Sequence, residues 1–556
     1  MSQSKPIQRT EVRIGHSLNE GEQDHVSRRR ETVLQCLKRH GISCSQDTMP
    51  NIALLGSGGG ERAMLGLLGS LVQLKNCDLL DSIMYLSGVS GSTWCMASLY
   101  KESDWSTNLD AVKENIIKRL DGPEVSWSDA WKKLNKYYDQ NDNFSLTDVW
   151  AVMFVTMIMK EIDENTISGQ RENHSKDPYP IYTVIDKQCK KKELNRDVWF
   201  EVAPHEAGYS LTGAFVDYAY FGSQFEEGRL VKKQPEIDML YLQGLCGSAL
   251  ADGQEILIWL WEHIKNLLPF AQYSLRGQKV LLTLMELNVC VLNKEDPTSL
   301  ITEMTVQLEG KLDKHGRAMF ISKKELLHDR DHQILKKYTL MICKNFQDWF
   351  EDAPVSPTVQ RHAEARISWI IPKIFELLTN WTWGTTHNFL HQMKVEDVDP
   401  SVLSEEERNY MDAGLLNNSP YFPMLRKERH IDLFISLDFS SGDPMETVVK
   451  ASEMCKELKI PFPEVKPPPK SSEPDDFYCF EGKNGAPTVI HIPLFNKVNC
   501  HGHIKDWEKE YTTFHEPYSG DVIIKLIEKA GENVINNKGK LIRVIRSVTE
   551  EKGKTQ

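Results

Sequence analysis

Ser90 lies in a run of small residues that could hold a serine nucleophile at a sharp turn. The run Gly88-Val89-Ser90-Gly91-Ser92 follows an apolar segment and precedes one with helical spacing. A serine hydroxyl becomes a useful nucleophile when a strand-to-helix turn exposes it beside a base. The run departs from Gly-x-Ser-x-Gly because Ser92 stands in place of the second glycine. The pattern therefore favours a nucleophile at Ser90, and a turn without chemistry is the alternative.

A second glycine run, earlier in the chain, could supply the oxyanion-binding part of such a site. Gly58, Gly59 and Gly60 follow another apolar segment and precede a helical pattern. Consecutive glycines let backbone N–H groups approach an oxyanion, and the following helix adds its positive dipole. Arg62 opposes that dipole in the first helical turn, so it suggests a nearby anion such as a phosphate. A surface arginine is the alternative.

The same glycine run also fits the dinucleotide-binding pattern Gly-x-Gly-x-x-Ala over residues 58–63. Asp78 and Asp81 lie downstream, where that fingerprint has an acidic residue. This alternative predicts a nucleotide-dependent oxidoreductase, but it leaves the Ser90 turn unexplained. A P-loop is excluded because no Gly-Lys-Ser/Thr follows.

The residue that would act as the base is not identified by local pattern. His387 could complete a Ser-His-Asp arrangement, whereas Asp412 could act as the sole base. Spacing does not choose between them, because catalytic partners can lie far apart in a sequence.

Two consecutive strand–loop–helix units are expected to position the two glycine turns. Such units predict an α/β fold with a central, mainly parallel sheet flanked by helices. Strand patterns return late in the chain. The expected strands are 51–55, 82–86, 431–439 and 489–493, and the expected helices are 61–68 and 93–100.

The 556 residues are expected to form one large catalytic domain with extensions. An amphipathic pattern at 26–37 predicts a helix before it. The apolar run at 256–268 predicts either a buried helix or a lid. The expected boundaries are a helical extension at 1–50, the catalytic domain at 51–546 with a variable insertion at about 250–375, and a polar tail at 547–556.

The net charge of −13 argues against nucleic acid as a partner. An anionic partner would have to meet a local basic patch, such as Arg28-Arg29-Arg30 or residues 538–546. The alternative for both patches is a solvated helix face.

Targeting signals and cysteine spacing predict an intracellular protein. The 11 cysteines include no Cys-x-x-Cys pair, so neither a zinc site nor a disulfide framework is expected. Residues 1–31 lack the apolar segment of a signal peptide. Neither myristoylation nor prenylation is expected, because the chain begins Met1-Ser2 and ends in Gln556 without a Cys-a-a-X box.

Taken together, the ordered motifs resemble the group IV cytosolic phospholipase A2 family, most closely its gamma type, which lacks a C2 domain. The similarity covers roughly residues 30–250 and 375–535. The segments that carry it are Gly56-Ser57-Gly58-Gly59-Gly60 with Arg62-Ala63, Leu86 to Trp94, Phe221-Gly222-Ser223-Gln224-Phe225, Trp383 to Leu390, Asp412-Ala413-Gly414-Leu415 and Leu437 to Pro444.

The resemblance implies an α/β acyl hydrolase of phospholipids and lysophospholipids, with a Ser–Asp dyad and no cofactor or metal. It makes Ser90 the nucleophile and Asp412 the general base, and it makes His387 structural. It assigns the oxyanion hole to the glycine loop, chiefly Gly59 and Gly60, and the substrate phosphate to Arg62. A transacylase would use the same site.

Two departures from the family pattern shape the expectation further. Most members carry an N-terminal calcium-binding C2 domain, which residues 1–50 are too few to form, so activity without calcium is expected. The gamma type would suggest a prenylated C-terminus, which this chain lacks, so a cytoplasmic enzyme with peripheral, transient membrane association is expected. A catalytically silent lipid-binding homologue is the alternative.

Overall fold

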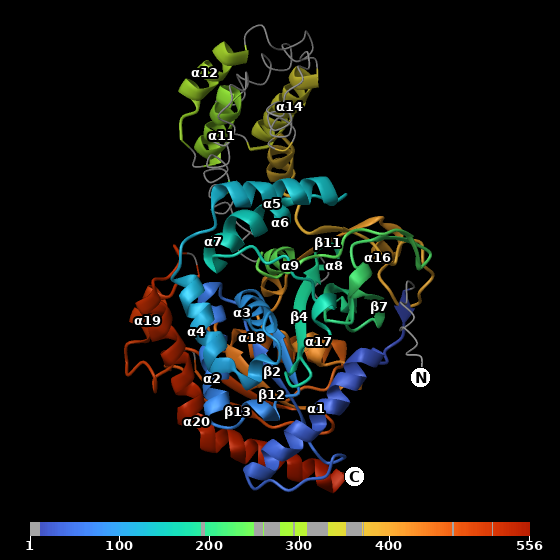
Figure 1. Cartoon of the computed structure of the whole chain (residues 1–556), viewed down its shortest axis with the longest axis vertical. Coiled ribbons are helices and arrows are strands. Elements are labelled where there is room, and N and C mark those ends of the chain that lie inside the picture. Colours follow the sequence, from blue (N-terminus) through green and yellow to red (C-terminus); the bar gives the residue numbers. More distant parts are fainter. Residues whose placement is uncertain are drawn as a thin grey trace. The chain divides into compact units, whose positions relative to one another are not determined.

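The computed structural model describes residues 12–190, 195–248, 260, 278–292, 295–308, 332–351, 370, 372–469, 472–513 and 515–555. The chain divides into two compact units. The first comprises Met1–Glu124, Val155–Ala249 and Thr386–Gln556, and the second comprises Val125–Phe154 and Leu250–Thr385. Figure 1 shows the elements of both.

The first unit is built on a large mixed sheet whose middle five strands run parallel, as expected. These strands lie in the order β4-β3-β2-β12-β14. Antiparallel strands extend the sheet on both sides. The parallel strands are β2 (Asn51–Gly56), β3 (Tyr85–Gly88), β4 (Tyr179–Asp186), β12 (Ile431–Asp438) and β14 (Thr488–Pro493).

The antiparallel part of the sheet continues from β4 through β5, β6 and β7 to β1, and β13 closes the other edge. Strand β11 also pairs with β4, and β10 pairs with β11. The bounds are β1 (Arg13–Ile14), β5 (Trp199–Val202), β6 (Glu206–Tyr209), β7 (Ala214–Asp217), β10 (Thr385–His387), β11 (Glu407–Asp412) and β13 (Tyr478–Phe480). A separate pair is formed by β8 (Gln224–Glu226) and β9 (Arg229–Lys232).

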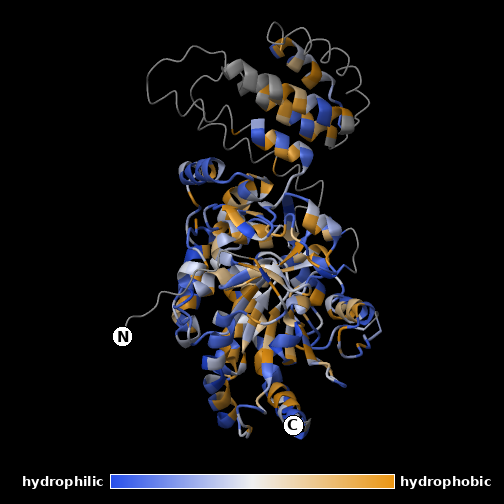
Figure 2. Cartoon of the chain, turned by 90° about the vertical axis from the view of Figure 1, so that its right-hand side faces the viewer, coloured by the Kyte–Doolittle hydropathy of each residue, from blue (hydrophilic) through white to orange (hydrophobic). Residues whose placement is uncertain are grey.

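Burial of the parallel strands explains their sequences. Every residue of β2, β3, β4 and β14 is buried. Strands covered on both faces read as continuous apolar runs rather than alternating ones. In Figure 2 the strands at the centre of the molecule's larger part are mostly pale to orange, while the helices around them carry both blue and orange residues.

Helices cover this sheet, and each of the two glycine turns connects a strand to the helix that follows it. Helix α2 follows β2 and α3 follows β3. The last helix, α20, packs closely on α2, because a Cβ added at Gly69 would lie 2.2 Å from the carbonyl oxygen of Ile527. The helices of this unit are α1 (Glu20–Arg39), α2 (Glu61–Asn76), α3 (Gly91–Tyr100), α4 (Leu109–Leu120), α7 (Thr156–Met159), α8 (Lys187–Lys190), α9 (Met239–Cys246), α16 (Pro400–Ser404), α17 (Tyr421–Met424), α18 (Glu446–Leu458), α19 (Ile504–Glu510) and α20 (Gly520–Thr555).

The predicted elements around the glycine turns are confirmed, with shifted boundaries. Strand β3 begins at Tyr85 rather than at residue 82, because residues 80–82 form a 3-10 turn. Helix α1 extends the predicted helix at 26–37, and its N-cap is Asn19, whose side chain accepts the N–H of Gly21.

The described part of the second unit is helical. Asn288 of α11 donates to the Thr339 hydroxyl of α14 at 3.0 Å, and Gln307 of α12 donates to Thr283 of α11 at 2.9 Å. Most of the run at 256–268 lies outside the described residues. The described helices include α5 (Trp127–Gln140), α6 (Leu146–Trp150), α11 (Gln278–Leu292), α12 (Thr298–Leu308) and α14 (His332–Glu351), and residues 372–380 are also helical.

Among the described residues, no helix combines the length and the apolar character needed to cross a bilayer.

Candidate active site

Ser90 occupies a strained turn between β3 and α3. Its backbone has φ 52° and ψ −125°, in the positive-φ region that non-glycine residues seldom adopt. Such strain collects at functional sites, because the surrounding structure must hold it in place. The turn is enclosed, since Ser90 is 5% exposed. The local geometry is therefore that of a nucleophile turn.

The glycine loop lies directly against the Ser90 turn. A Cβ added at Gly58 would lie 2.7 Å from the Cβ of Ser90, and one added at Gly91 would lie 1.8 Å from the Gly60 carbonyl oxygen. Gly60 also has φ 61°, which side chains disfavour. Glycine is thus required on both sides of this contact. The structure brings together the two turns that the sequence singled out.

Ser92 explains the departure from the glycine pattern. Its hydroxyl donates to the carbonyl oxygen of Ser57 at 2.6 Å, which joins the serine turn to the start of the glycine loop. The Ser57 hydroxyl in turn accepts the N–H of Phe439 at 2.7 Å. A glycine at position 92 could not form the hydrogen bond to the Ser57 carbonyl.

The loop amides are not equivalent. Gly58 donates its N–H to the carbonyl oxygen of Asn418 at 3.2 Å. Within the described part of the chain, the N–H groups of Gly59 and Gly60 have no acceptor. These two donors remain for an oxyanion. Asn418 also donates its side-chain amide to the Gly58 carbonyl at 3.0 Å, a role that no sequence motif signalled.

Asp412 ends strand β11, and the sheet register brings that end toward the Ser90 turn. Gly88, the last residue of β3, pairs with Tyr182 of β4, and Asp412 pairs with Val184. Since β5 occupies the other edge of β4 at these residues, β3 and β11 lie on the same side and their carboxyl ends face each other. The two pairings are roughly 7 Å apart along β4.

The interaction of Asp412 with Cys246 supports the proximity of Asp412 to the Ser90 turn. Burial raises the pKa of the Cys246 thiol, the negative charge of Asp412 raises it further, and a hydrogen bond with Thr93 opposes the shift. Thr93 lies in the first turn of α3, three residues after Ser90, and its hydroxyl donates to the Ser90 carbonyl. Cys246 therefore lies near both Asp412 and the serine turn. Asp412 itself is fully buried, and its Oδ1 accepts the N–H of Gly414 at 2.7 Å.

His387 lies at the other end of β11. The N–H of the next residue, Asn388, donates to the carbonyl of Glu406, immediately before the strand begins at Glu407. Asp412 ends that strand, five residues later, which corresponds to about 16 Å. This separation favours the structural role of His387 over a place between Ser90 and Asp412.

Arg62 is buried beside the glycine loop and bonds to neutral acceptors. It donates to the carbonyl oxygens of Phe439 at 2.9 Å and Tyr511 at 2.5 Å, and to the Thr513 hydroxyl at 3.2 Å. Its Nη2 lies 2.9 Å from the position of a Cβ on Gly59.

The acid beside Arg62 offers little compensation for its charge. Burial raises the pKa of the Glu61 carboxyl to about 8, so that group is largely protonated at neutral pH. The guanidinium keeps its charge even when buried. Asp438 and Glu508 also act on the guanidinium, and the positive charge of Arg62 at the N-terminus of α2 suits an anionic substrate group.

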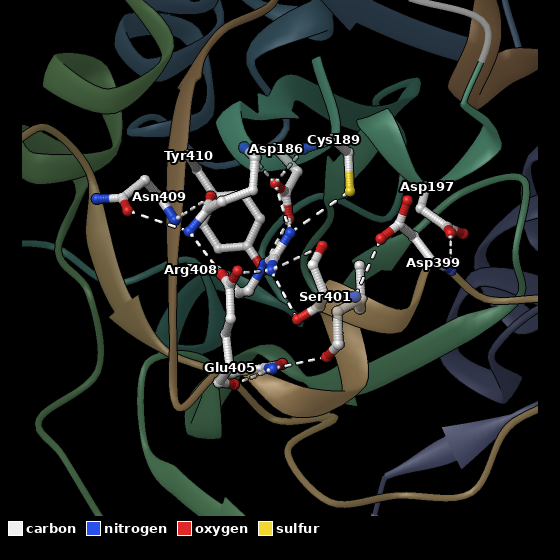
Figure 3. Close-up of polar contacts among 12 residues, drawn as sticks. Asp186, Cys189, Asp197, Asp399, Ser401, Glu405, Arg408, Asn409 and Tyr410 are labelled. Atoms are coloured by element: carbon white, nitrogen blue, oxygen red, sulfur yellow. Dashed lines mark hydrogen bonds and ion pairs between the residues drawn. The ribbon is translucent and has the colours of Figure 1, made fainter. Parts of the chain in front are cut away.

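A buried ion pair holds β11 on β4 (Figure 3). Arg408 forms two parallel hydrogen bonds with Asp186, from Nε to Oδ2 and from Nη2 to Oδ1, each 2.8 Å long. Both side chains are fully buried, and the Tyr209 hydroxyl donates to the same carboxylate at 2.8 Å. Because Arg408 and Asp412 share one strand, this pair also sets the register that carries Asp412 to its position.

We expect Arg408→Met to destabilise the chain by about 3–5 kcal/mol, because it leaves the Asp186 carboxylate buried without its partner. Thermal unfolding of the two proteins measures the difference. Glu405→Ala is the matched control. Glu405 also pairs with Arg408, at 2.9 Å, but its side chain is 44% exposed, so its loss should cost under about 1 kcal/mol. Equal stability of Arg408→Met and the wild type would contradict a structural role for the pair.

The fold and the two joined turns define an α/β acyl hydrolase. A family model described as "Lysophospholipase catalytic domain" matches residues 52–254. Mouse cytosolic phospholipase A2 gamma is 31% identical over 564 residues, which cover 96% of this chain and 92% of that protein. Human cytosolic phospholipase A2 gamma is 33% identical over 552 residues, with 97% and 96% covered.

The chain therefore belongs to the cytosolic phospholipase A2 family and is an enzyme of the phospholipase A2/lysophospholipase type. The solved structure of human GIVD cytosolic phospholipase A2 has the same fold, with a TM-score of 0.67 and 21% sequence identity, covering 98% of this chain and 67% of that one. The family resemblance and the fold class predicted from sequence are confirmed. The finding favours acyl hydrolysis over the dinucleotide-binding alternative.

Proposed function

We propose that this enzyme cleaves fatty-acyl esters of glycerophospholipids and lysophospholipids through an acyl-serine, with Ser90 as nucleophile and Asp412 as general base. The observation that carries the proposal is the direct contact between the strained Ser90 turn and a glycine loop in which the amides of Gly59 and Gly60 have no acceptor among the described residues. The convergence of the β3 and β11 ends supports Asp412 as the partner.

The reaction takes place in two steps on these groups. Asp412 accepts the Ser90 proton while the serine oxygen attacks the ester carbonyl, and the amides of Gly59 and Gly60 donate to the oxyanion. The ester C–O bond breaks, and the leaving alkoxide takes the proton back from Asp412. Water, deprotonated by Asp412, then attacks the acyl-serine and releases the fatty acid. A lipid alcohol in place of water would give transacylation.

The substrate surface and calcium requirement form part of the same proposal. We infer a cytoplasmic enzyme that acts on membrane surfaces through peripheral contact and needs no calcium. Serine-ester chemistry is completed by the nucleophile, the base and the amide donors, so no step in it calls for a metal.

The test is fatty-acid release from doubly labelled phosphatidylcholine and lysophosphatidylcholine vesicles. We expect release from both lipids by the wild type, unchanged when a chelator removes calcium. Release that stops with chelator and returns with added calcium would contradict calcium independence. Vesicle binding without any release would favour the catalytically silent homologue.

Arg62 supplies a selectivity prediction. A hydrogen bond to a charged group contributes about 1.5–3 kcal/mol, so Arg62→Ala should lower kcat/KM for phospholipid roughly 10- to 100-fold. A neutral aryl ester lacks the phosphate and should lose far less. The ratio of the two kcat/KM values is the measurement, because Arg62 also bonds to Phe439, Tyr511 and Thr513, and a folding defect would lower both activities equally. Equal losses would contradict the phosphate role.

A further inference from the structure

A cleft of about 690 Å³ lies at the amino ends of the parallel strands, whereas the Ser90 turn lies at their carboxyl ends. It forms where β2, β12 and β14 begin, and its lining includes Asn51, Ile431 and Pro487. The glycine loop follows the other end of β2, which six residues make roughly 20 Å long. The cleft is therefore separate from the candidate active site. Its volume falls within the range of small-molecule sites.

Two cations on the cleft wall have no acidic partner. In the described part of the chain, the guanidinium of Arg30 donates to the Gln46 carbonyl oxygen but forms no ion pair, and the ammonium of Lys427 has no ion pair or hydrogen bond. Arg30 belongs to the basic run noted in the sequence. Its neighbour Arg29 is fully buried and donates to the carbonyl of Ile83 instead. The structure thus directs one arginine of that run to the cleft.

Other charges of the cleft are already balanced. Lys552 pairs with Asp432 at 2.7 Å, and Arg426 pairs with Glu201 at 2.7 Å. Asp47 is the remaining acid in the lining. The cleft consequently keeps a positive excess, although the whole chain carries −13. A basic cleft in an acidic protein favours an anion there over other surface positions.

We propose that this cleft binds a small, soluble organic phosphate. Arg30 and Lys427 attract the phosphate from the wall of the cleft. Leu425 and Ile460 supply apolar contact for the remainder of the molecule. Nucleotides and inositol phosphates share this chemistry. The inference does not depend on the proposed acyl-transfer mechanism.

The test is calorimetric titration of the full chain with ATP, inositol hexakisphosphate and inorganic phosphate, each without divalent metal. We expect at least one organic phosphate to bind with a Kd below about 1 mM, and more tightly than inorganic phosphate. Binding should persist after a lipid fluorophosphonate has blocked the serine. Equal affinity for inorganic phosphate, or no binding of either organic phosphate, would overturn the proposal.

The variant Arg30→Ala/Lys427→Ala should weaken the Kd by about tenfold or more, because it removes both unpaired cations. Lys118→Ala/Lys538→Ala is the matched control. It removes two charges from exposed positions of α4 and α20 that do not line the cleft. We expect the control to bind as the wild type does. Wild-type affinity in the first variant would show that the ligand binds elsewhere, and an equal loss in the control would show that net charge governs binding; either result would overturn the proposal.

Discussion

Ser90→Ala is expected to abolish fatty-acid release, with a loss of kcat of roughly 10⁴-fold or more. In the proposed mechanism, the variant lacks the oxygen that forms the acyl-enzyme, and no other group in the turn takes its place at the glycine loop. A lipid fluorophosphonate, which labels activated serines, should modify the wild type and leave Ser90→Ala unmodified. Mass spectrometry of the labelled chain measures both outcomes.

Two variants of the same turn separate chemistry from folding. Ser92→Ala removes the bond to Ser57 but keeps the nucleophile, so it should still be labelled at Ser90. Ser90→Gly relieves the positive φ and should be inactive yet more stable than the wild type, by about 1 kcal/mol. Substantial activity in Ser90→Ala would refute the assignment of the nucleophile. An unstable Ser90→Gly would contradict the inferred strain.

Asp412→Asn is expected to lower kcat/KM by about 10²- to 10⁴-fold, the usual contribution of a general base. The amide keeps the size of the carboxylate and can still accept the N–H of Gly414, so the local fold should remain. It is a poor proton acceptor, and serine attack would then depend on hydroxide. We therefore expect the residual rate of the variant to rise steadily with pH.

His387→Ala decides between the dyad and the triad. Because His387 ends β10 beside the beginning of β11 and Asp412 ends β11, we expect the histidine variant to retain activity within a few-fold of the wild type. Initial rates on lysophosphatidylcholine for the two variants, measured over the same pH range, provide the comparison. A loss in His387→Ala as large as that in Asp412→Asn would restore the Ser-His-Asp arrangement.

Local sequence patterns were enough to predict the two strand–turn–helix units and the family. The apolar runs of β2 and β3, the glycines after them and the helical spacing beyond predict two strand–turn–helix units without any knowledge of distant residues. Both units formed as expected, and the positive φ of Ser90 lies in the turn that the small residues indicated. The ordered motifs also sufficed for the family, because many separate matches in one order seldom arise by chance.

Long-range strand pairing decided which distant residues meet the two turns. Asp412 approaches Ser90 because β11 runs antiparallel along the edge of β4 beyond the end of β3, a register that local pattern cannot reveal. The Arg408–Asp186 pair and the contact of Asn418 with Gly58 also join residues far apart in the chain. Among the described residues the amides of Gly59 and Gly60 have no acceptor, and they could be distinguished from the Gly58 amide only once Asn418 was known to accept from Gly58. Local sequence thus determined the two turns, whereas the sheet determined which distant side chains meet them, because strand pairing depends on contacts that no sequence window contains.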